Sequence, residues 1–175
     1  LAALYSMPGS VFRALGGWMS DKWGARSVMY ATFIVSLVCL FVMSYPETSY
    51  VVDGIEGPIA FDIGISLPVF VGLTVVLGFM MSLGKAAVYK HIPVYYPGNV
   101  GAVGGLVGMI GGLGGFVLPI SFGILNDWIG VWTNSFMLLF ALVLVSTIWM
   151  HVAIRIMERR KYPELAADTH LSDVP

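Results

Sequence analysis

Charged residues are scarce in this sequence: Asp, Glu, Lys and Arg make up 11% of its 175 residues, against about 25% in soluble domains. The net charge of −1 leaves no positive excess for a nucleic-acid backbone. The single cysteine, Cys39, cannot form a disulfide within the chain. Hydrophobic residues make up 58%. These proportions disfavour a cytosolic enzyme, a nucleic-acid-binding protein and a disordered tail, and they favour an integral membrane protein.

Four stretches contain no charged residue at all: 27–46, 63–84, 92–126 and 128–154. A helix needs about 20 mainly apolar residues to cross the hydrocarbon core of a bilayer, so each stretch is long enough to cross once. We therefore predict an all-α membrane protein with about five transmembrane helices. The predicted segments are a partial transmembrane helix at 1–16, a cytoplasmic loop at 17–26, a transmembrane helix at 27–45, a periplasmic or extracellular loop at 46–66, a transmembrane helix at 67–89, a cytoplasmic loop at 90–98, a glycine-rich transmembrane helix at 99–125, an external turn at 126–132, a transmembrane helix at 133–154 and a cytoplasmic tail at 155–175.

The distribution of Lys and Arg predicts the orientation. The segments 17–26 and 90–98 and the tail contain Lys or Arg, whereas the segment 46–66 contains acidic residues and no basic one. Since Lys and Arg favour the cytoplasmic side, we expect a multi-pass protein of the cell inner (plasma) membrane with a cytoplasmic C-terminus. The chain opens at Leu1 inside a hydrophobic helix, and we expect it to be the C-terminal part of a larger membrane protein.

Arg13 is the charged residue that most needs an explanation. It lies eight residues before Asp21, which places it about 12 Å deeper in the membrane at 1.5 Å per residue. A buried membrane arginine is costly and usually faces a protein cavity, and its guanidinium can donate two parallel hydrogen bonds to a planar oxyanion. Arg13 thus indicates an anion-binding site. The alternatives are an ion pair with a carboxylate on a helix outside this sequence and a side chain that extends to the interface.

Lys85 and Lys90 lie toward the basic end of the predicted helix 67–89. Lys90 is typical of a basic residue that anchors a helix at the cytoplasmic interface. Lys85 is about one and a half turns deeper. It either lines the cytoplasmic mouth of an anion pathway or extends its long side chain to the interface, and the sequence favours neither.

Glycine is concentrated in the predicted helix 99–125. At 100° per residue, seven glycines share one face about 120° wide, and we call this face the glycine stripe. It consists of Gly101, Gly104, Gly105, Gly108, Gly111, Gly112 and Gly115, while Gly114 lies off it. A flat glycine face lets another helix or a substrate approach the backbone closely. Tight helix packing alone is the alternative to a role in transport.

The turn at 17–26 resembles the cytoplasmic loop motif of the major facilitator superfamily, Gly-x-x-x-Asp-x-x-Gly-x-Arg, through Gly17, Asp21, Gly24 and Arg26. From the residues alone, Asp21 either caps the following backbone or pairs with a nearby arginine. The resemblance implies the C-terminal part of a twelve-helix major facilitator fold, from helix eight to helix twelve. It gives the superfamily and no substrate.

Two further features are similar to the nitrate/nitrite porter family of that superfamily. Arg13 matches the family's substrate arginine in helix eight, and the run from Gly104 to Gly115 resembles its glycine-rich nitrate signature in helix eleven. The segment 84–93 is also similar to the end of the family's helix ten. The resemblance implies exchange of nitrate for nitrite, or nitrate uptake with protons, by alternating access, together with a second half of the site on helices upstream of Leu1.

This resemblance implies roles for individual residues. Expected substrate-binding residues are Arg13, Gly104, Gly108, Gly111, Gly112 and Gly115, and expected pathway or gating residues are Asp21, Arg26 and Lys85. The expected partners are nitrate or nitrite, membrane lipids and the missing N-terminal helices, with no nucleic acid, cofactor or metal. A major facilitator carrier of another small anion, such as a carboxylate, is the main alternative, and a non-transporting membrane scaffold subunit is the other. An enzyme is not expected, because no arrangement of catalytic residues occurs in the spans.

Overall fold

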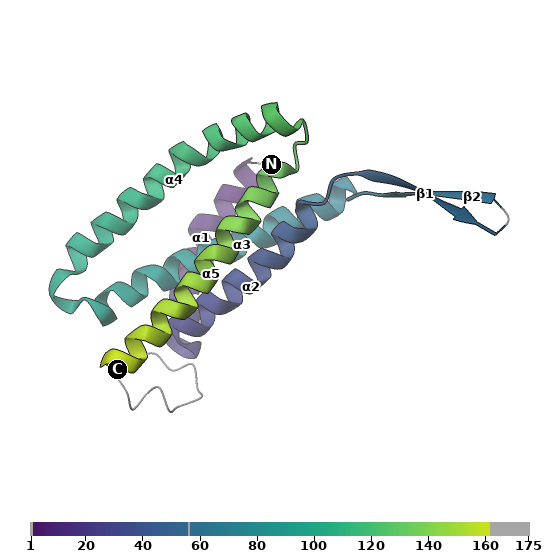
Figure 1. Ribbon diagram of the computed structural model, residues 1–175. Helices are drawn as coiled ribbons and strands as arrows, with labels where there is room; N and C mark the ends of the chain where they lie inside the picture. Colours follow the sequence, from purple (N-terminus) through teal and green to yellow (C-terminus); the bar gives the residue numbers. More distant parts are fainter. Residues whose placement is uncertain (1, 56, 162–175) are drawn as a thin grey trace.

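The computed structural model describes residues 2–55 and 57–161, which form a bundle of long helices with one β-hairpin projecting from it (Figure 1). The elements in chain order are α1 (Ala2–Trp23), α2 (Ala25–Met43), β1 (Thr48–Gly54), β2 (Gly57–Ile63), α3 (Leu67–Tyr95), the short 3-10 helix η1 (Pro97–Asn99), α4 (Val100–Ile129) and α5 (Asn134–Lys161).

Glycine permits the two sharpest changes of direction between helices. Gly24 alone separates α1 from α2, and its φ of 80° is one that L side chains rarely adopt. Gly130, with φ 73°, ends α4 in the left-handed conformation, and its N–H donates to the carbonyl of Asn126 at 2.8 Å. Neither reversal leaves room for a long connecting loop.

The core of the bundle lies between α1, α2, α3 and α5. At one end Ala25 and Val28 of α2 pack against Leu83 and Ala87 of α3. At the other end, residues of α2 and α3 meet α5, and the members of this second cluster are Cys39, Leu40, Met43 and Leu77 with Phe136, Leu139, Phe140 and Val143 packed against them. The apolar faces of three spans therefore hold the helices together along their length.

Two glycines outside the glycine stripe allow the closest helix contacts. A methyl group added at Gly16 of α1 would lie 2.9 Å from the Cβ of Ala86 and 3.0 Å from the Cα of Leu83, both on α3. One added at Gly84 of α3 would lie 2.8 Å from the Cγ2 of Thr32 on α2. The distances of 2.9 Å at Gly16 and 2.8 Å at Gly84 are shorter than real methyl contacts, so α3 approaches its two neighbours through these positions as small residues permit in membranes.

Helix α4 contacts only α3, α5 and η1 among the described elements, and none of its residues is buried. In Figure 1 it runs along one side of the bundle and stands apart from it over much of its length. Because α4 is apolar along its whole length, its exposed surface here is one that water would not solvate well.

Within the described part of the chain, four helices are long and apolar enough to cross a membrane: Ala25–Met43, Leu67–Tyr95, Pro97–Ile129 and Asn134–Ile156. They coincide with the four complete spans expected from the sequence. Helix α1 is not among them, although its 22 residues would extend about 33 Å. It carries Arg13, Asp21 and Lys22.

The structure differs from the predicted segments at three places. Residues 17–23 form the last turns of α1, so the turn at 17–26 is shorter than predicted, because Gly24 makes the reversal alone. Residues 90–95 continue α3 through Pro93, although the sequence predicted a loop at 90–98. Pro93 cannot donate the backbone hydrogen bond to the carbonyl of Tyr89, and α3 ends two residues later. The limits of the membrane itself stay predictions.

The third difference is the β-hairpin within the predicted loop 46–66. Strands β1 and β2 pair antiparallel from Thr48 opposite Ile63 to Gly54 opposite Gly57. The rings of Tyr50 and Phe61 stack at 5.7 Å between centroids, and the hydroxyls of Tyr45 and Tyr50 are hydrogen-bonded at 2.6 Å. These contacts support a largely exposed hairpin that extends from the ends of α2 and α3.

Candidate functional site

Arg13 lies on a face of α1 that borders the packed one. Phe12 meets Phe79 of α3 edge to face at 4.8 Å, and Gly16 touches the backbone of α3. Arg13 follows Phe12 by 100° around the helix, and its side chain is exposed in this structure. No carboxylate among the described side chains forms an ion pair with it. The guanidinium is therefore available at the side of the bundle, about 12 Å from the level of Asp21.

The acidic residue of the loop motif joins α1 to α3. The ammonium group of Lys90 donates a hydrogen bond to Asp21 Oδ1, and the two groups form an ion pair. Lys90 lies at the end of α3 and Asp21 at the end of α1, so the pair closes the gap between the two helix ends. Of the two roles left open for Asp21, pairing with a cation is the one observed, and the cation is Lys90 and not an arginine.

The basic residue of the motif, Arg26, is buried, with 4% of its surface exposed. Its Nη2 donates to the hydroxyl of Tyr95 at 3.3 Å, and Tyr95 in turn lies against the ring of His91 at 5.5 Å between centroids. Arg26 thus connects the start of α2 to the last turn of α3. The turn between α1 and α2 is therefore held to α3 from both of its sides.

The glycine stripe of α4 is open over most of its length. A methyl group added at Gly105, Gly111, Gly112 or Gly115 would meet nothing within 4 Å. The exceptions are Gly104, where the Cδ1 of Ile92 would be 3.9 Å away, and Gly108, where the hydroxyl of Tyr89 would be 3.6 Å away. Within the described residues the stripe is thus not a packing surface, and packing against helices outside this chain stays the alternative to a role in transport.

One face of α3 is directed toward the glycine stripe of α4. Ile92 and Tyr89 lie opposite Gly104 and Gly108, so the two helices run antiparallel here. Lys85 precedes Tyr89 by four residues and therefore lies on the same face, and continuing the register places it level with Gly111 and Gly112. Its side chain is exposed. The structure thus places the phenol hydroxyl of Tyr89 beside the stripe.

Arg13 and the glycine stripe are not brought together by this chain. Helices α1 and α4 do not contact each other among the described elements, and α3 lies against both. Tyr89 and Ile92 of α3 approach the stripe, Arg13 lies on α1, and Asp21 and Arg26 lie at the basic end. A substrate site that uses all of these residues needs further surfaces to complete it.

The sequence reasoning missed two tyrosines of this region. Tyr89 faces Gly108 and Tyr95 binds Arg26. Tyr89 could have been found from its spacing of four residues after Lys85. Tyr95 could not, since it lies in a stretch that was assigned to a loop because of Pro93 and Pro97.

Among the described residues no group of three or more His, Cys, Asp and Glu side chains gathers at a place that could hold a metal ion.

A model of the family described as the Major Facilitator Superfamily matches residues 1–173 of this sequence. The chain belongs to the major facilitator superfamily. The predicted fold class is thereby confirmed, and the helices described above are part of a multi-pass major facilitator membrane fold.

One curated relative is 42% identical over 174 residues, a match that covers 98% of this chain. That protein, from Thermus thermophilus, is described as "Probable nitrate/nitrite antiporter NarK1". The chain spans 39% of the length of this relative. No solved structure matches the chain. The major facilitator assignment therefore rests on the sequence, and the helical arrangement agrees with it.

Proposed function

We propose that the complete protein carries nitrate and nitrite across the membrane by alternating access, and that this chain supplies one part of the carrier. The observation that carries the proposal is Arg13, a guanidinium on a helix of a membrane bundle with no ion-pair partner among the described side chains. The 42% identical relative, described as a probable nitrate/nitrite antiporter, supports the choice of anion.

The chemistry of Arg13 suits a planar monoanion. Placing an arginine within a membrane span costs at least about 2.5 kcal/mol, so its retention needs a compensating interaction. Nitrate presents coplanar oxygens to the two parallel N–H donors of the guanidinium. We expect a counterpart cation on the part of the protein outside this chain, since substrate sites of transporters lie where structural repeats meet near the midplane.

The glycine stripe is the second part of the proposed site. Gly104, Gly108, Gly111, Gly112 and Gly115 present backbone without side chains, so an anion or a neighbouring helix can approach closely and can slide as the protein changes state. Tyr89 lies at the edge of this face, and we propose that Lys85, one turn before Tyr89 on α3, lines the pathway that leads to it.

Asp21 and Arg26 are proposed to control the cytoplasmic side of the pathway. Through Lys90 and Tyr95 they fix the turn between α1 and α2 to the end of α3. A rigid end of this kind can close against the other half of a carrier as one body. We therefore propose that the gating surface comprises the joined ends of these three helices.

The proposed location is the cell inner (plasma) membrane, with the C-terminus in the cytoplasm. Lys22, Lys90 and Arg155 lie at the end of the bundle that contains the turn, and the acidic residues Asp53 and Asp62 lie on the hairpin at the other end. The excess of Lys and Arg at cytoplasmic ends supports this orientation.

The test of the proposal is nitrate transport by the full-length protein in proteoliposomes. Arg13→Lys keeps the charge and loses the paired donors. A hydrogen bond to a charged group is worth about 1.5–3 kcal/mol, so nitrate affinity is expected to fall at least tenfold. Arg159→Lys, which changes an exposed arginine near the end of α5, is the matched control and should transport normally.

Normal nitrate uptake by Arg13→Lys would contradict the assignment of the site. Nitrite in excess should compete with nitrate, whereas competition by formate or oxalate without competition by nitrite would point to a carboxylate carrier. Preloading the vesicles with nitrite should accelerate nitrate entry if the protein is an antiporter, and a proton gradient should do so if it is a symporter.

A further inference from the structure

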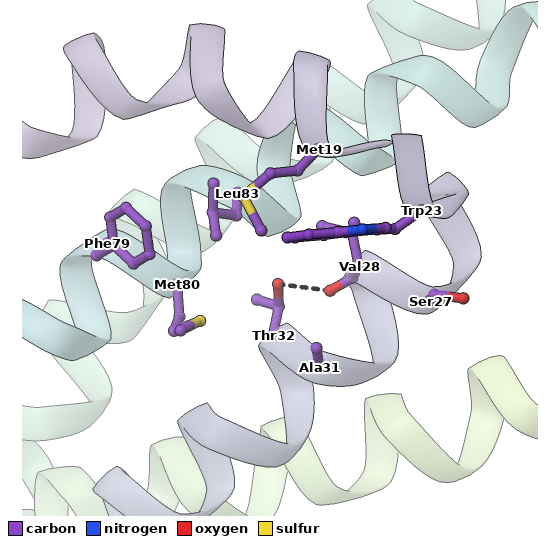
Figure 2. A pocket seen from close by; sticks show the side chains of 9 residues that line it. All are labelled: Met19, Trp23, Ser27, Val28, Ala31, Thr32, Phe79, Met80 and Leu83. Carbon is purple, nitrogen blue, oxygen red and sulfur yellow. Dashed lines mark hydrogen bonds between the residues drawn. The ribbon is translucent and has the colours of Figure 1, made fainter. Parts of the chain in front are cut away.

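An apolar pocket of about 320 Å³ lies between α1, α2 and α3 at the basic end of the bundle (Figure 2). Met19 and Trp23 of α1 cover one side, Phe79 and Met80 of α3 close another, and Ala31 of α2 forms part of the floor. The volume falls at the lower end of the range of small-molecule sites, about 300–1,000 Å³. The pocket is thus large enough for part of a flexible apolar ligand.

The pocket lining contains few polar atoms that could form hydrogen bonds with a polar ligand. The hydroxyl of Thr32 donates to the carbonyl of Val28 at 2.8 Å, as the dashed line in Figure 2 shows. The remaining members are mostly aromatic, aliphatic or thioether side chains. A cavity lined in this way stays dry or accepts apolar matter, and it therefore fits hydrocarbon better than nitrate.

The rim of the pocket is polar and positively charged. Trp23 contacts Trp18 at 6.4 Å between centroids, and the ammonium group of Lys22 lies 5.3 Å from the centre of the Trp18 ring. Both indole rings are more than half exposed, as is typical of residues at a membrane interface. Asp21, beside them, is already paired with Lys90, so Lys22 gives this rim a positive charge.

A second cation lies on the neighbouring helix. The hydroxyl of Tyr30 on α2 is hydrogen-bonded to Nδ1 of His151 on α5 at 2.9 Å. Because α2 and α5 run in opposite directions (Figure 1), Arg155 lies one turn beyond His151, at the level of Ser27 on the rim of the pocket. Lys22 and Arg155 thus mark the same end of the bundle.

We propose that this pocket holds an acyl chain of an anionic phospholipid whose phosphate lies at the Lys22 rim. The chain itself gains little on entering, because lipid tails are as apolar as the side chains that replace them. The preference therefore comes from charge: one basic residue near an anionic headgroup is worth about 1 kcal/mol, or about fivefold in affinity. The charge at the rim selects the anionic headgroup, and the apolar lining of the pocket accommodates the chain. The lipid would rest against α1, α2 and α3 where they are held together.

The experiment is native mass spectrometry of the purified full-length protein, equilibrated with equal amounts of dioleoyl phosphatidylglycerol and dioleoyl phosphatidylcholine. The wild type should retain phosphatidylglycerol in preference to phosphatidylcholine. Ala31→Phe fills the pocket and should reduce the number of retained lipids by one. Ala141→Phe, an exposed alanine on α5 away from the pocket, should leave the number unchanged.

A second pair of variants tests the charge without altering the pocket. Lys22→Gln should lower the ratio of phosphatidylglycerol to phosphatidylcholine about fivefold, while Arg159→Gln, which removes an exposed charge farther along α5, should change it less. Equal lipid retention by Ala31→Phe and Ala141→Phe would overturn the proposal. The same refuting result is expected if another helix of the protein fills the pocket. So would a loss in Ala31→Phe with an unchanged ratio in Lys22→Gln. The readout is independent of nitrate transport.

Discussion

The neighbouring glycines Gly16 and Gly17 of α1 offer the sharpest test of the helix packing. An alanine methyl at Gly16 would lie 2.9 Å from the Cβ of Ala86 and 3.0 Å from the Cα of Leu83, whereas one at Gly17 would meet nothing within 4 Å. The first contact is with backbone and a methyl group, which cannot rotate away. Gly16→Ala therefore has to push α1 and α3 apart, and Gly17→Ala does not.

The size of the effect follows from two opposing terms. Replacing glycine by alanine inside a helix stabilises it by about 0.5–1 kcal/mol, and both variants share this gain. Overfilling a close-packed contact costs about 1–3 kcal/mol, and only Gly16→Ala incurs this cost. We expect Gly17→Ala to be neutral or slightly stabilising, and Gly16→Ala to be about 1–3 kcal/mol less stable than Gly17→Ala.

The assay is unfolding of the full-length protein in a mild detergent, followed by the fluorescence of its tryptophans. Expression and insertion of the two variants should be similar, since the helix itself is not weakened. Gly16→Val, with a larger side chain, should unfold still more easily. Equal stabilities of Gly16→Ala and Gly17→Ala would refute the close approach of α1 and α3 described here.

Two further predictions concern the basic end and the glycine stripe. Asp21→Asn and Lys90→Gln should each lower the free energy of unfolding by no more than about 1 kcal/mol, because the ion pair is partly exposed. The double variant should lose less stability than the sum of the two single losses. Additive losses would show that the pair does not stabilise the fold. Gly112→Leu should stop nitrate transport without loss of folded protein, because the side chain enters open space in the present structure. Gly114→Leu lies off the stripe in equally open space and should transport, and equal activity of both leucine variants would remove the stripe from the mechanism.

Long apolar runs made the helical part of the fold predictable. Each of the four complete spans expected from the sequence corresponds to a helix long enough to cross a membrane, because length and hydrophobicity are local properties of a chain. The ends were less predictable. Pro93 suggested a loop, yet α3 continues to Tyr95, since one missing donor near a helix terminus is offset by contacts such as that of Tyr95 with Arg26.

The hairpin was recognisable in principle and was overlooked. The run from Tyr50 to Val52 and the run from Ile59 to Phe61 are rich in β-branched and aromatic residues and flank two glycines, which is a hairpin pattern. Because it lies between two membrane spans, the whole stretch was predicted to be a loop. Its strands are stabilised by pairs such as Tyr50 with Phe61, which a search for transmembrane runs does not consider.

Individual residues of the candidate site could be predicted from the sequence, but their arrangement in space could not. Arg13 and the glycine stripe are recognisable because each is unusual for a membrane span. Their relative positions depend on contacts between distant parts of the chain, and the partners of Asp21 and Arg26 proved to be Lys90 and Tyr95. The contacts of Gly16 and Gly84 with α3 and α2 follow no sequence periodicity and appear only in three dimensions.

The single-residue turn at Gly24 has a consequence for biosynthesis. Helix α1 carries three charged residues and does not meet the hydropathy of a membrane span, whereas α2 does. With one residue between them, we expect α1 and α2 to insert into the bilayer as a joined pair, in which the apolar surface of α2 helps to offset the cost of Arg13. A longer connection would let α1 remain outside while α2 crossed alone. We therefore expect the tight turn to couple the insertion of α1 to that of α2 during synthesis.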